Sequence, residues 1–224
     1  MNRVNEVIYC FWTGDNPLTQ NRIDALKSMQ DNLEVPIECL DKDKIKEREL
    51  KDSPYHPAYP YLSAVHKADY LRCYFMHHFG GGYADIKHYT KQNNWKKCFE
   101  KINCNSEIDV IGQQETITGG RRPIYNTVDG ASRLIATCYF ICRPKSDFTN
   151  KWYALTMRKL DEKLAALKAH PAQSPFDRSP EYPLKWVELL GMIFHDLVFE
   201  TSFLNPYSIR RELITGRDNE KPYR

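Results

Sequence analysis

Apolar runs and amphipathic segments alternate along this chain. Residues 6–12 form a nearly continuous apolar run, which is typical of a strand buried on both faces. Residues 20–32 space their apolar positions as an amphipathic helix does, and Thr19 is a suitable N-cap. Further strands are expected at 35–40, 108–113 and 135–142, and further helices at 42–50, 147–169 and 184–199. Strands that alternate with helices predict an α/β fold with a mainly parallel central sheet.

The most informative predicted helix has the sequence HKADYLRCYFMHHF at residues 66–79. Asp69 and Arg72 are three residues apart, so they share a helical face. Apolar residues occupy both this side and the opposite side, which indicates a buried helix. Because a buried charge must be paired or must hold a ligand, Asp69 and Arg72 are candidate functional residues.

A glycine-rich turn follows this helix. Gly80, Gly81 and Gly82 end the helix and allow a backbone turn that side chains would obstruct. Residues 83–89 then alternate as a strand does, which places Asp85 and Lys87 on one face. An acid and a base are therefore expected together at the end of the turn.

This segment resembles the DXD-containing sugar-binding glycosyltransferases, a family that includes glucosylating toxins and bacterial capsule and lipopolysaccharide enzymes. The resemblance rests on Asp69, Arg72, Gly81-Gly82, Tyr83 and Asp85. It covers residues 1–90, and the remainder only in general layout. Lys87 replaces the second Asp of the family's Asp-X-Asp motif. The alternative is a buried helix with an internal ion pair and a solvated Lys87.

The resemblance implies a GT-A fold in one domain, with residues 1–90 as the donor-binding half and 91–224 as the acceptor side and C-terminal lid. It implies a retaining hexosyl- or N-acetylhexosaminyltransferase that uses a nucleotide-sugar donor, with a UDP-sugar favoured. The acceptor would be a growing bacterial surface polysaccharide or a lipid-linked glycan. The alternative is a non-catalytic protein that binds nucleotide sugars or glycans through a decayed motif.

Candidate donor-binding residues lie at the first strand end and along the motif. Aromatic rings at a strand end can wall a nucleobase, while amides can bind base or sugar hydroxyls. Carboxylates can accept hydrogen bonds from ribose and sugar hydroxyls, and a guanidinium can grip phosphate. The set comprises Phe11, Trp12, Asn16, Asn21, Asp69, Arg72, Gly82 and Tyr83. Core packing is the alternative for the two rings at 11 and 12, and turn or helix roles for the two amides.

Lys87 carries the strongest expectation about catalysis. The leaving diphosphate gains negative charge in the transition state, and a positive group must meet it. Two carboxylates with a divalent cation are neutral together, and so are Asp85 and Lys87. The sequence therefore favours a site without a metal, in which Lys87 replaces both the carboxylate and the cation. Mn²⁺ or Mg²⁺ bound by Asp85 and His195 is the alternative, although these two side chains offer few oxygen ligands.

The predicted last helix, 184–199, supplies lid candidates. Glu188 and His195 join Asp85 and Lys87 as candidate catalytic residues, with a surface ion pair and a structural histidine as the respective alternatives. Helical spacing favours Trp186 as a core residue. On the acceptor side the candidates are Gln113, Gln114 and Glu115, with Arg121 and Arg122 as candidate anion ligands.

Composition limits the classes of binding partner and the cellular compartment that suit this chain. A net charge of +3 is too mild to indicate nucleic-acid binding. The seven Cys are odd in number and form no CxxC, which favours reduced, cytosolic core thiols over disulfides or zinc. A cytoplasmic protein without a signal peptide or membrane span is expected. The basic residues Arg210, Arg211, Arg217, Lys221 and Arg224 suit a loose contact with the inner membrane surface, or a solvated tail.

Overall fold

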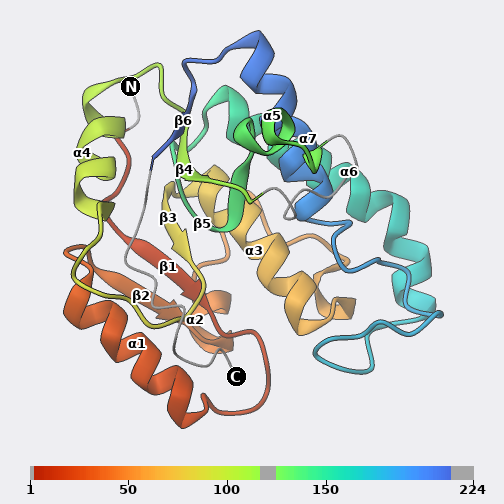
Figure 1. The fold of residues 1–224 in the computed structure, drawn as a ribbon. Coiled ribbons are helices and arrows are strands. Elements are labelled where there is room, and N and C mark those ends of the chain that lie inside the picture. The colour runs from red at the N-terminus through yellow and green to blue at the C-terminus, as the bar shows by residue number, and fades with distance from the viewer. Residues whose placement is uncertain (1–2, 117–124, 213–224) are drawn as a thin grey trace.

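The computed structural model describes residues 3–116 and 125–212, which form a six-stranded sheet covered by helices on both faces (Figure 1). The sheet order is β2-β1-β3-β5-β4-β6. The strands are β1 (Ile8–Phe11), β2 (Ile37–Leu40), β3 (Gly81–Ala84), β4 (Val110–Gln114), β5 (Ile135–Cys142) and β6 (Ile209–Arg211). Strand β5 is antiparallel to its neighbours β3 and β4, whereas β1 is parallel to β2 and β3, and β4 is parallel to β6. The predicted α/β class with a mainly parallel sheet is confirmed.

Helices pack against the two faces of the sheet as separate layers. On one side lie α1 (Gln20–Asn32) and α4 (Trp95–Cys104), and on the other lie α3 (Ala64–His78), α6 (Asp147–Ala169) and α7 (Gly191–Leu204) (Figure 1). The short helices are α2 (Lys42–Glu47) and α5 (Val128–Ser132), with a 3-10 turn at Tyr59–Tyr61. Strand β1 contributes side chains to the hydrophobic core on each side of the sheet. Ile8 and Cys10 face α1 and α4, while Tyr9 and Phe11 face α3. No helix within the described ranges is long and apolar enough to cross a membrane.

The glycine turn after α3 depends on conformations and space that side chains lack. Gly80 and Gly81 have φ of 66° and 101°, in the region that only glycine adopts readily. A Cβ on Gly80 would lie 2.4 Å from Cδ of Pro144. The turn therefore brings β3 directly beneath the end of α3, which places Asp69, Arg72 and Asp85 on neighbouring elements.

Gly82 is required by packing of a different kind. Its φ is ordinary, but an added Cβ would lie 2.9 Å from Cζ3 of Trp95 and 3.2 Å from Cγ1 of Ile8. We expect Gly82→Ala to lower the free energy of unfolding by about 1–3 kcal/mol, because the methyl group overpacks a closed core. Urea denaturation of the two proteins measures the difference. An unchanged midpoint and slope would show that Trp95 moves aside at no cost.

The predicted strand at 83–89 is wrong beyond Ala84. Asp85 still donates its N–H to the carbonyl of Cys138 at 2.9 Å, but the chain then turns toward α1. There Arg22 donates to the carbonyl of Ile86, and Ser28 donates to the carbonyl of Tyr89 at 2.8 Å. These side chains replace a neighbouring strand as hydrogen-bond partners, so the segment leaves the sheet.

The predicted last helix is also displaced. Residues 185–190 form turns, and α7 begins at Gly191 and continues to Leu204 rather than ending at 199. The carboxylate of Glu188 accepts a hydrogen bond from the N–H of Lys185 at 3.0 Å, which stabilises this turn instead of a helical ladder. Helix α4 and strand β6 were not expected from the sequence, whereas α1, β5 and α6 have the predicted bounds.

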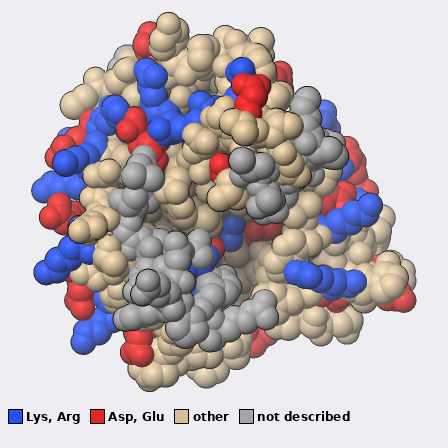
Figure 2. Space-filling view, viewed as in Figure 1, with Lys and Arg blue, Asp and Glu red and all other residues tan. Residues whose placement is uncertain are grey.

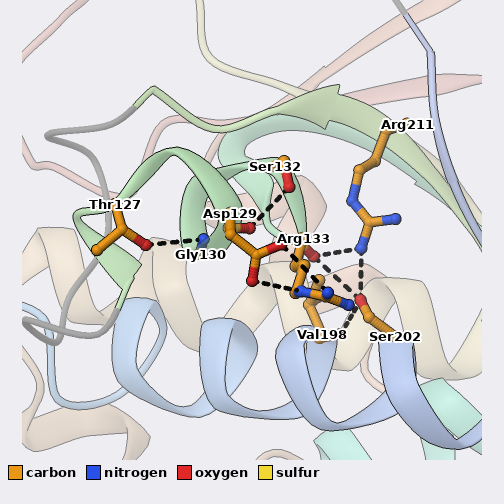
Figure 3. A network of polar contacts seen from close by, with 8 residues as sticks. All are labelled: Thr127, Asp129, Gly130, Ser132, Arg133, Val198, Ser202 and Arg211. Carbon is orange, nitrogen blue, oxygen red and sulfur yellow. Dashed lines mark hydrogen bonds and ion pairs between the residues drawn. The ribbon is translucent and has the colours of Figure 1, made fainter.

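A polar network joins α5 to α7 and β6 (Figure 3). The carbonyl of Arg133 accepts hydrogen bonds from Oγ of Ser202 at 3.1 Å and from the guanidinium of Arg211, while the side chain of Arg133 pairs with Asp129. Arg210 and Arg211 therefore belong to β6 and not to a solvated tail, which corrects the expectation for those two. Arg217, Lys221 and Arg224 lie outside the described residues, as do Arg121 and Arg122.

Candidate active site

A cleft of about 810 Å³ opens where β1 and β3 end. These strands are parallel neighbours, with Tyr9 opposite Tyr83, so their carboxyl ends meet at one edge of the sheet. The first turns of α3 and the first residues of β5 complete the floor. Figure 2 shows this face hollowed near its centre, with acidic and basic atoms inside the hollow. Among the described residues, the charged side chains that line the cleft are Arg22, Asp69, Arg72, Asp85 and Glu115.

Arg72 is the centre of the charged cluster in the cleft. Its Nη2 lies 3.5 Å from Oδ1 of Asp85, and its Nη1 lies 3.7 Å from Oδ1 of Asp69. Nη1 also donates to the carbonyl of Thr137 at 3.2 Å, and the guanidinium lies 4.3 Å from the ring centroid of Tyr83. Helix α3, strand β3 and strand β5 thus all hold one side chain, which is thereby preorganised to face a ligand.

Asp85 is contacted at both carboxylate oxygens. The hydroxyl of Tyr83 donates to Oδ1 at 2.7 Å, and Nζ of Lys87 lies 3.4 Å from Oδ2. Lys87 does not itself line the cleft. Its ammonium group is connected to the cleft by its contact with Asp85, which does line it. The four side chains of Asp69, Arg72, Asp85 and Lys87 carry no net charge together. All four are mostly buried, which strengthens their mutual interactions.

Burial and the neighbouring groups have opposite effects on the pKa of Arg72. Burial acts to lower the pKa of Arg72, but Tyr83, Asp85 and Asp69 raise it by more, so the guanidinium remains charged. Burial raises the pKa of Tyr83 well above its usual value, which keeps the phenol protonated as a donor to Asp85. The cluster therefore presents a permanent cation and a hydrogen-bonded carboxylate to the cleft.

Two cationic side chains flank Asp85, the carboxylate that a metal ion would need. Its carboxylate already lies between Arg72 and Lys87, and both would repel a metal ion. Within the described ranges no three His, Cys, Asp or Glu side chains are grouped as a metal site. His195, the second ligand of the metal alternative, is fully buried, and its Nε2 lies 3.6 Å from Oε2 of Glu115.

Trp12 and Asn16 form one wall of the cleft. Nε1 of Trp12 donates to the carbonyl of Asn16 at 2.7 Å, which fixes the indole at the end of β1. Phe11 lies deeper, stacked on Tyr83 with ring centroids 5.7 Å apart. Asn21 is outside the lining, with its Oδ1 3.2 Å from Nε2 of His88. Of the first-strand candidates, Phe11, Trp12 and Asn16 therefore reach the cleft.

The remaining candidates divide between the cleft and the framework. Glu115 lines the cleft, whereas Gln113 and Gln114 do not. Glu188 lies 3.4 Å from Nζ of Lys163, so it ties the turn at 185–190 to α6. The Cα of Gly82 faces Trp95 in the core on the α1 and α4 side, away from the cleft lining.

Several residues of the cleft were missed or misread from the sequence, among them Arg22, Thr137 and Trp186. Arg22 reaches the site from α1, and Thr137 reaches it from β5. Trp186 was expected in the core, but it is 38% exposed and lines the cleft, because the segment that carries it is not helical. The signal for Arg22 was its position as a basic residue in the first turn of α1, the helix that follows the first strand. Trp186 offered no such signal.

Residues 171–190, here called the wall segment, close the cleft opposite β1 and are anchored to α3 through His66. Nδ1 of the buried His66 lies 3.0 Å from the hydroxyl of Tyr182, and its Nε2 lies 3.2 Å from the carbonyl of Lys185. The N–H of Ser63 also donates to that hydroxyl at 3.1 Å. Because burial lowers the pKa of His66, the imidazole is neutral near pH 7 and bridges two points of the wall segment.

The contribution of His66 to stability should depend on pH. We expect His66→Asn to lower the free energy of unfolding by about 1–3 kcal/mol at pH 8, because buried partners lose their hydrogen bonds. The folded pKa of His66 is below its usual value of 6.5, so the unfolded chain binds the proton first as the pH falls. Wild type alone loses stability in this way, so the difference between the proteins should shrink below about pH 6.5. Urea denaturation at pH 8 and pH 5.5 tests this, and a constant difference would contradict it.

Comparison with known proteins finds similarity among solved structures only. No protein-family model matches this chain, and no curated protein matches it. Among solved structures, the PaToxG glycosyltransferase is similar over 91% of this chain and 70% of its own, with 12% identity and a TM-score of 0.49.

Proposed function

We propose that this protein is a glycosyltransferase that moves a sugar from a nucleotide-sugar donor, with a UDP-sugar favoured, to a saccharide acceptor. One observation carries the proposal: a single cleft at the strand ends holds Trp12, Asp69, Arg72 and Asp85 together. These residues supply an aromatic wall, two carboxylates and a guanidinium, which match a base, sugar hydroxyls and a diphosphate. The volume of about 810 Å³ suits a ligand of this size.

Each side chain has a role that follows from its chemistry. Trp12 would wall the base at the end of β1. Asp69 and Asp85 would accept hydrogen bonds from ribose and sugar hydroxyls, because a carboxylate is an acceptor only. Arg72 would bind phosphate oxygens through two parallel N–H groups, and its three anchors would hold that fork in place.

The cationic partners of Asp85 would promote departure of the diphosphate. As the bond between the anomeric carbon and the phosphate oxygen breaks, negative charge grows on the leaving group. Arg72 would meet this charge directly. Lys87 would neutralise Asp85, so that the carboxylate does not repel the leaving group. Attack by an acceptor hydroxyl from the face that the leaving group vacates would retain the anomeric configuration. The hydroxyl proton would pass to the departing phosphate oxygen, so this path needs few protein groups.

The biological setting follows from the sequence resemblance. We propose a hexosyl or N-acetylhexosaminyl donor, and a growing bacterial surface polysaccharide or lipid-linked glycan as acceptor. Transfer would take place in the cytoplasm or at the inner face of the membrane.

A non-catalytic binding protein is the second candidate. The observation that favours it is the contact of Lys87 with Asp85, because the same ammonium group occupies the position at which the family carries a metal-binding carboxylate. This candidate predicts donor binding with no transfer and no hydrolysis of the donor.

A panel of nucleotide sugars tests the proposal. Thermal unfolding would be followed with UDP-, GDP- and CMP-sugars, each with and without EDTA. A donor at 100 times its Kd should stabilise the protein by about 2.7 kcal/mol. Trp12→Ala should weaken that effect, and Tyr207→Ala, which changes an exposed ring elsewhere, should not. The proposal fails if no nucleotide sugar stabilises the wild-type protein. Binding without release of the free nucleotide diphosphate would favour the non-catalytic candidate.

A further inference from the structure

Two exposed aromatic rings lie at the mouth of the cleft. Phe176 is 58% exposed and Trp186 is 38% exposed, and both line the cleft from the wall segment. Their ring centroids are 6.2 Å apart with an angle of 23° between the planes, so the two rings lie nearly parallel to each other. Large apolar groups that remain exposed beside a polar cleft indicate a binding surface.

The backbone that carries the two rings is fixed at several points. The carbonyl of Pro175 accepts a hydrogen bond from the N–H of Val65 at 3.3 Å. The side chain of Asp177, which is 5% exposed, accepts from the N–H groups of Gln173 at 2.7 Å and Ser179 at 2.9 Å. These bonds lower the pKa of Asp177, so the cap persists as a carboxylate. On the other side of the pair, His66 holds the residue before Trp186. The rings are therefore presented on a rigid support, which reduces the ordering cost of binding.

A cationic group lies on one face of Trp186 and is not part of the cleft lining. The guanidinium carbon of Arg178 lies 4.1 Å from the ring centroid of Trp186. This cation–π contact helps to fix the position of the indole. Exposed apolar rings match a pyranose, which has C–H groups on its faces.

We propose that Phe176 and Trp186 form an acceptor subsite that takes one pyranose ring of a saccharide. The sugar packs its C–H face against the ring surface that the pair presents to the cleft. This inference rests on the proposed function, and it assigns the acceptor to the mouth of the cleft. The donor occupies the interior, where Asp69, Arg72 and Asp85 lie.

Position and exposure favour the acceptor over the nucleobase as the occupant. Trp12 is fixed by Asn16 at the end of β1, next to β3, which Asp85 directly follows, so it walls the donor. The wall segment belongs to a different part of the chain, and its rings at Phe176 and Trp186 are exposed to solvent. A polysaccharide acceptor must extend from the cleft into solvent, and an exposed ring pair at the mouth allows this.

The test separates acceptor binding from donor binding in the full chain. Saturation-transfer NMR would use methyl β-glucopyranoside, methyl β-galactopyranoside and methyl β-glucuronide as probes, with UDP present. Calorimetry would measure the affinity for the nucleotide sugar found in the panel. The variants are Phe176→Ala and Trp186→Ala, with Trp186→Phe as the conservative rescue. Phe203→Ala is the matched control, because Phe203 is 56% exposed and lies under Arg133 instead.

The expected result is that at least one glycoside binds the wild type, and that each alanine variant raises its Kd by about 2- to 12-fold. Trp186→Phe should restore most of this affinity, and Phe203→Ala should not change it. Affinity for the nucleotide sugar should stay within twofold throughout. Equal glycoside binding by wild type and Trp186→Ala overturns the inference, as does a wild type that binds none of the glycosides.

Two other outcomes distinguish this inference from the proposed function. If nucleotide-sugar affinity falls as much as glycoside affinity in Trp186→Ala, the ring pair serves the donor, and the acceptor assignment is overturned while the proposed function stands. If the wild type binds no nucleotide sugar but binds a glycoside through Trp186, the proposed function fails and the saccharide site stands.

Discussion

Replacing Arg72 by alanine should lower the affinity for the nucleotide-sugar donor by about 30- to 800-fold, equivalent to about 2–4 kcal/mol. The substitution removes a charge-assisted fork from the incoming diphosphate. It also leaves the carboxylates of Asp69 and Asp85 without the cation that lies between them. Both effects act against an anionic ligand, so the loss should exceed that of an ordinary hydrogen bond.

Calorimetry with the preferred donor measures this change. Arg158→Ala is the matched control, because it removes an exposed arginine from α6. Arg72→Lys keeps the charge but not the fork, and its donor affinity should fall between those of wild type and Arg72→Ala. The double variant Asp69→Asn with Arg72→Gln removes both members of an ion pair, which protects the fold if the single variant is unstable. Unchanged donor affinity in a folded Arg72→Ala protein would contradict the assignment of Arg72.

The convergence of Asp69, Arg72 and Asp85 could be predicted because it depends on short-range geometry. A spacing of three residues places two side chains on one face of a helix. The glycine turn then fixes where the next strand starts. No contact between distant parts of the chain is needed to bring these three side chains together, and the structure places all three in one cleft.

The wall segment could not be predicted for the opposite reason. Its conformation is set by His66 and Ser63, which are more than 100 residues earlier in the chain. The local pattern around Trp186 has helical spacing, but these tertiary contacts and the Glu188 cap hold the backbone in turns. The same displacement explains Glu188, which contacts α6 rather than the cleft.

The surroundings of Lys87 could be predicted from the sequence only in part. The alternation of residues 85 and 87 correctly predicted that an acid and a base would meet, although the strand itself ends at Ala84. The sequence could not show that Asp85 would lie between two cations, because Arg72 reaches it from another element. Because Nζ of Lys87 lies against Asp85 and Lys87 does not line the cleft, we propose that Lys87 controls the charge on Asp85 and does not contact the donor directly.

Lys87→Ala should lower the rate of transfer by about 10²–10³ while turnover by the wild type survives EDTA. Without the ammonium group, the cluster of Asp69, Arg72 and Asp85 has a net charge of −1, and it faces a leaving group that is itself gaining negative charge. This penalty grows along the reaction, so kcat should fall more than donor affinity. Lys91→Ala is the matched control, because Lys91 is exposed in the same segment.

The substitution Lys87→Asp tests whether Lys87 takes the place of a metal ion or only supplies a positive charge. The substitution rebuilds Asp-X-Asp, so the variant should lose turnover in EDTA and regain part of it with Mn²⁺, whereas the wild type should respond to neither. Initial rates of the two proteins in EDTA and in Mn²⁺ provide the comparison, and thermal unfolding confirms that both are folded. Suppose instead that wild-type turnover vanishes in EDTA and returns with Mn²⁺. The charge balance of the site would then depend on a cation, and the role of Lys87 as its replacement would be wrong. Because the outcome reverses between the two hypotheses for the same two proteins, the pair of measurements decides whether the ammonium group beside Asp85 does the work of a metal ion.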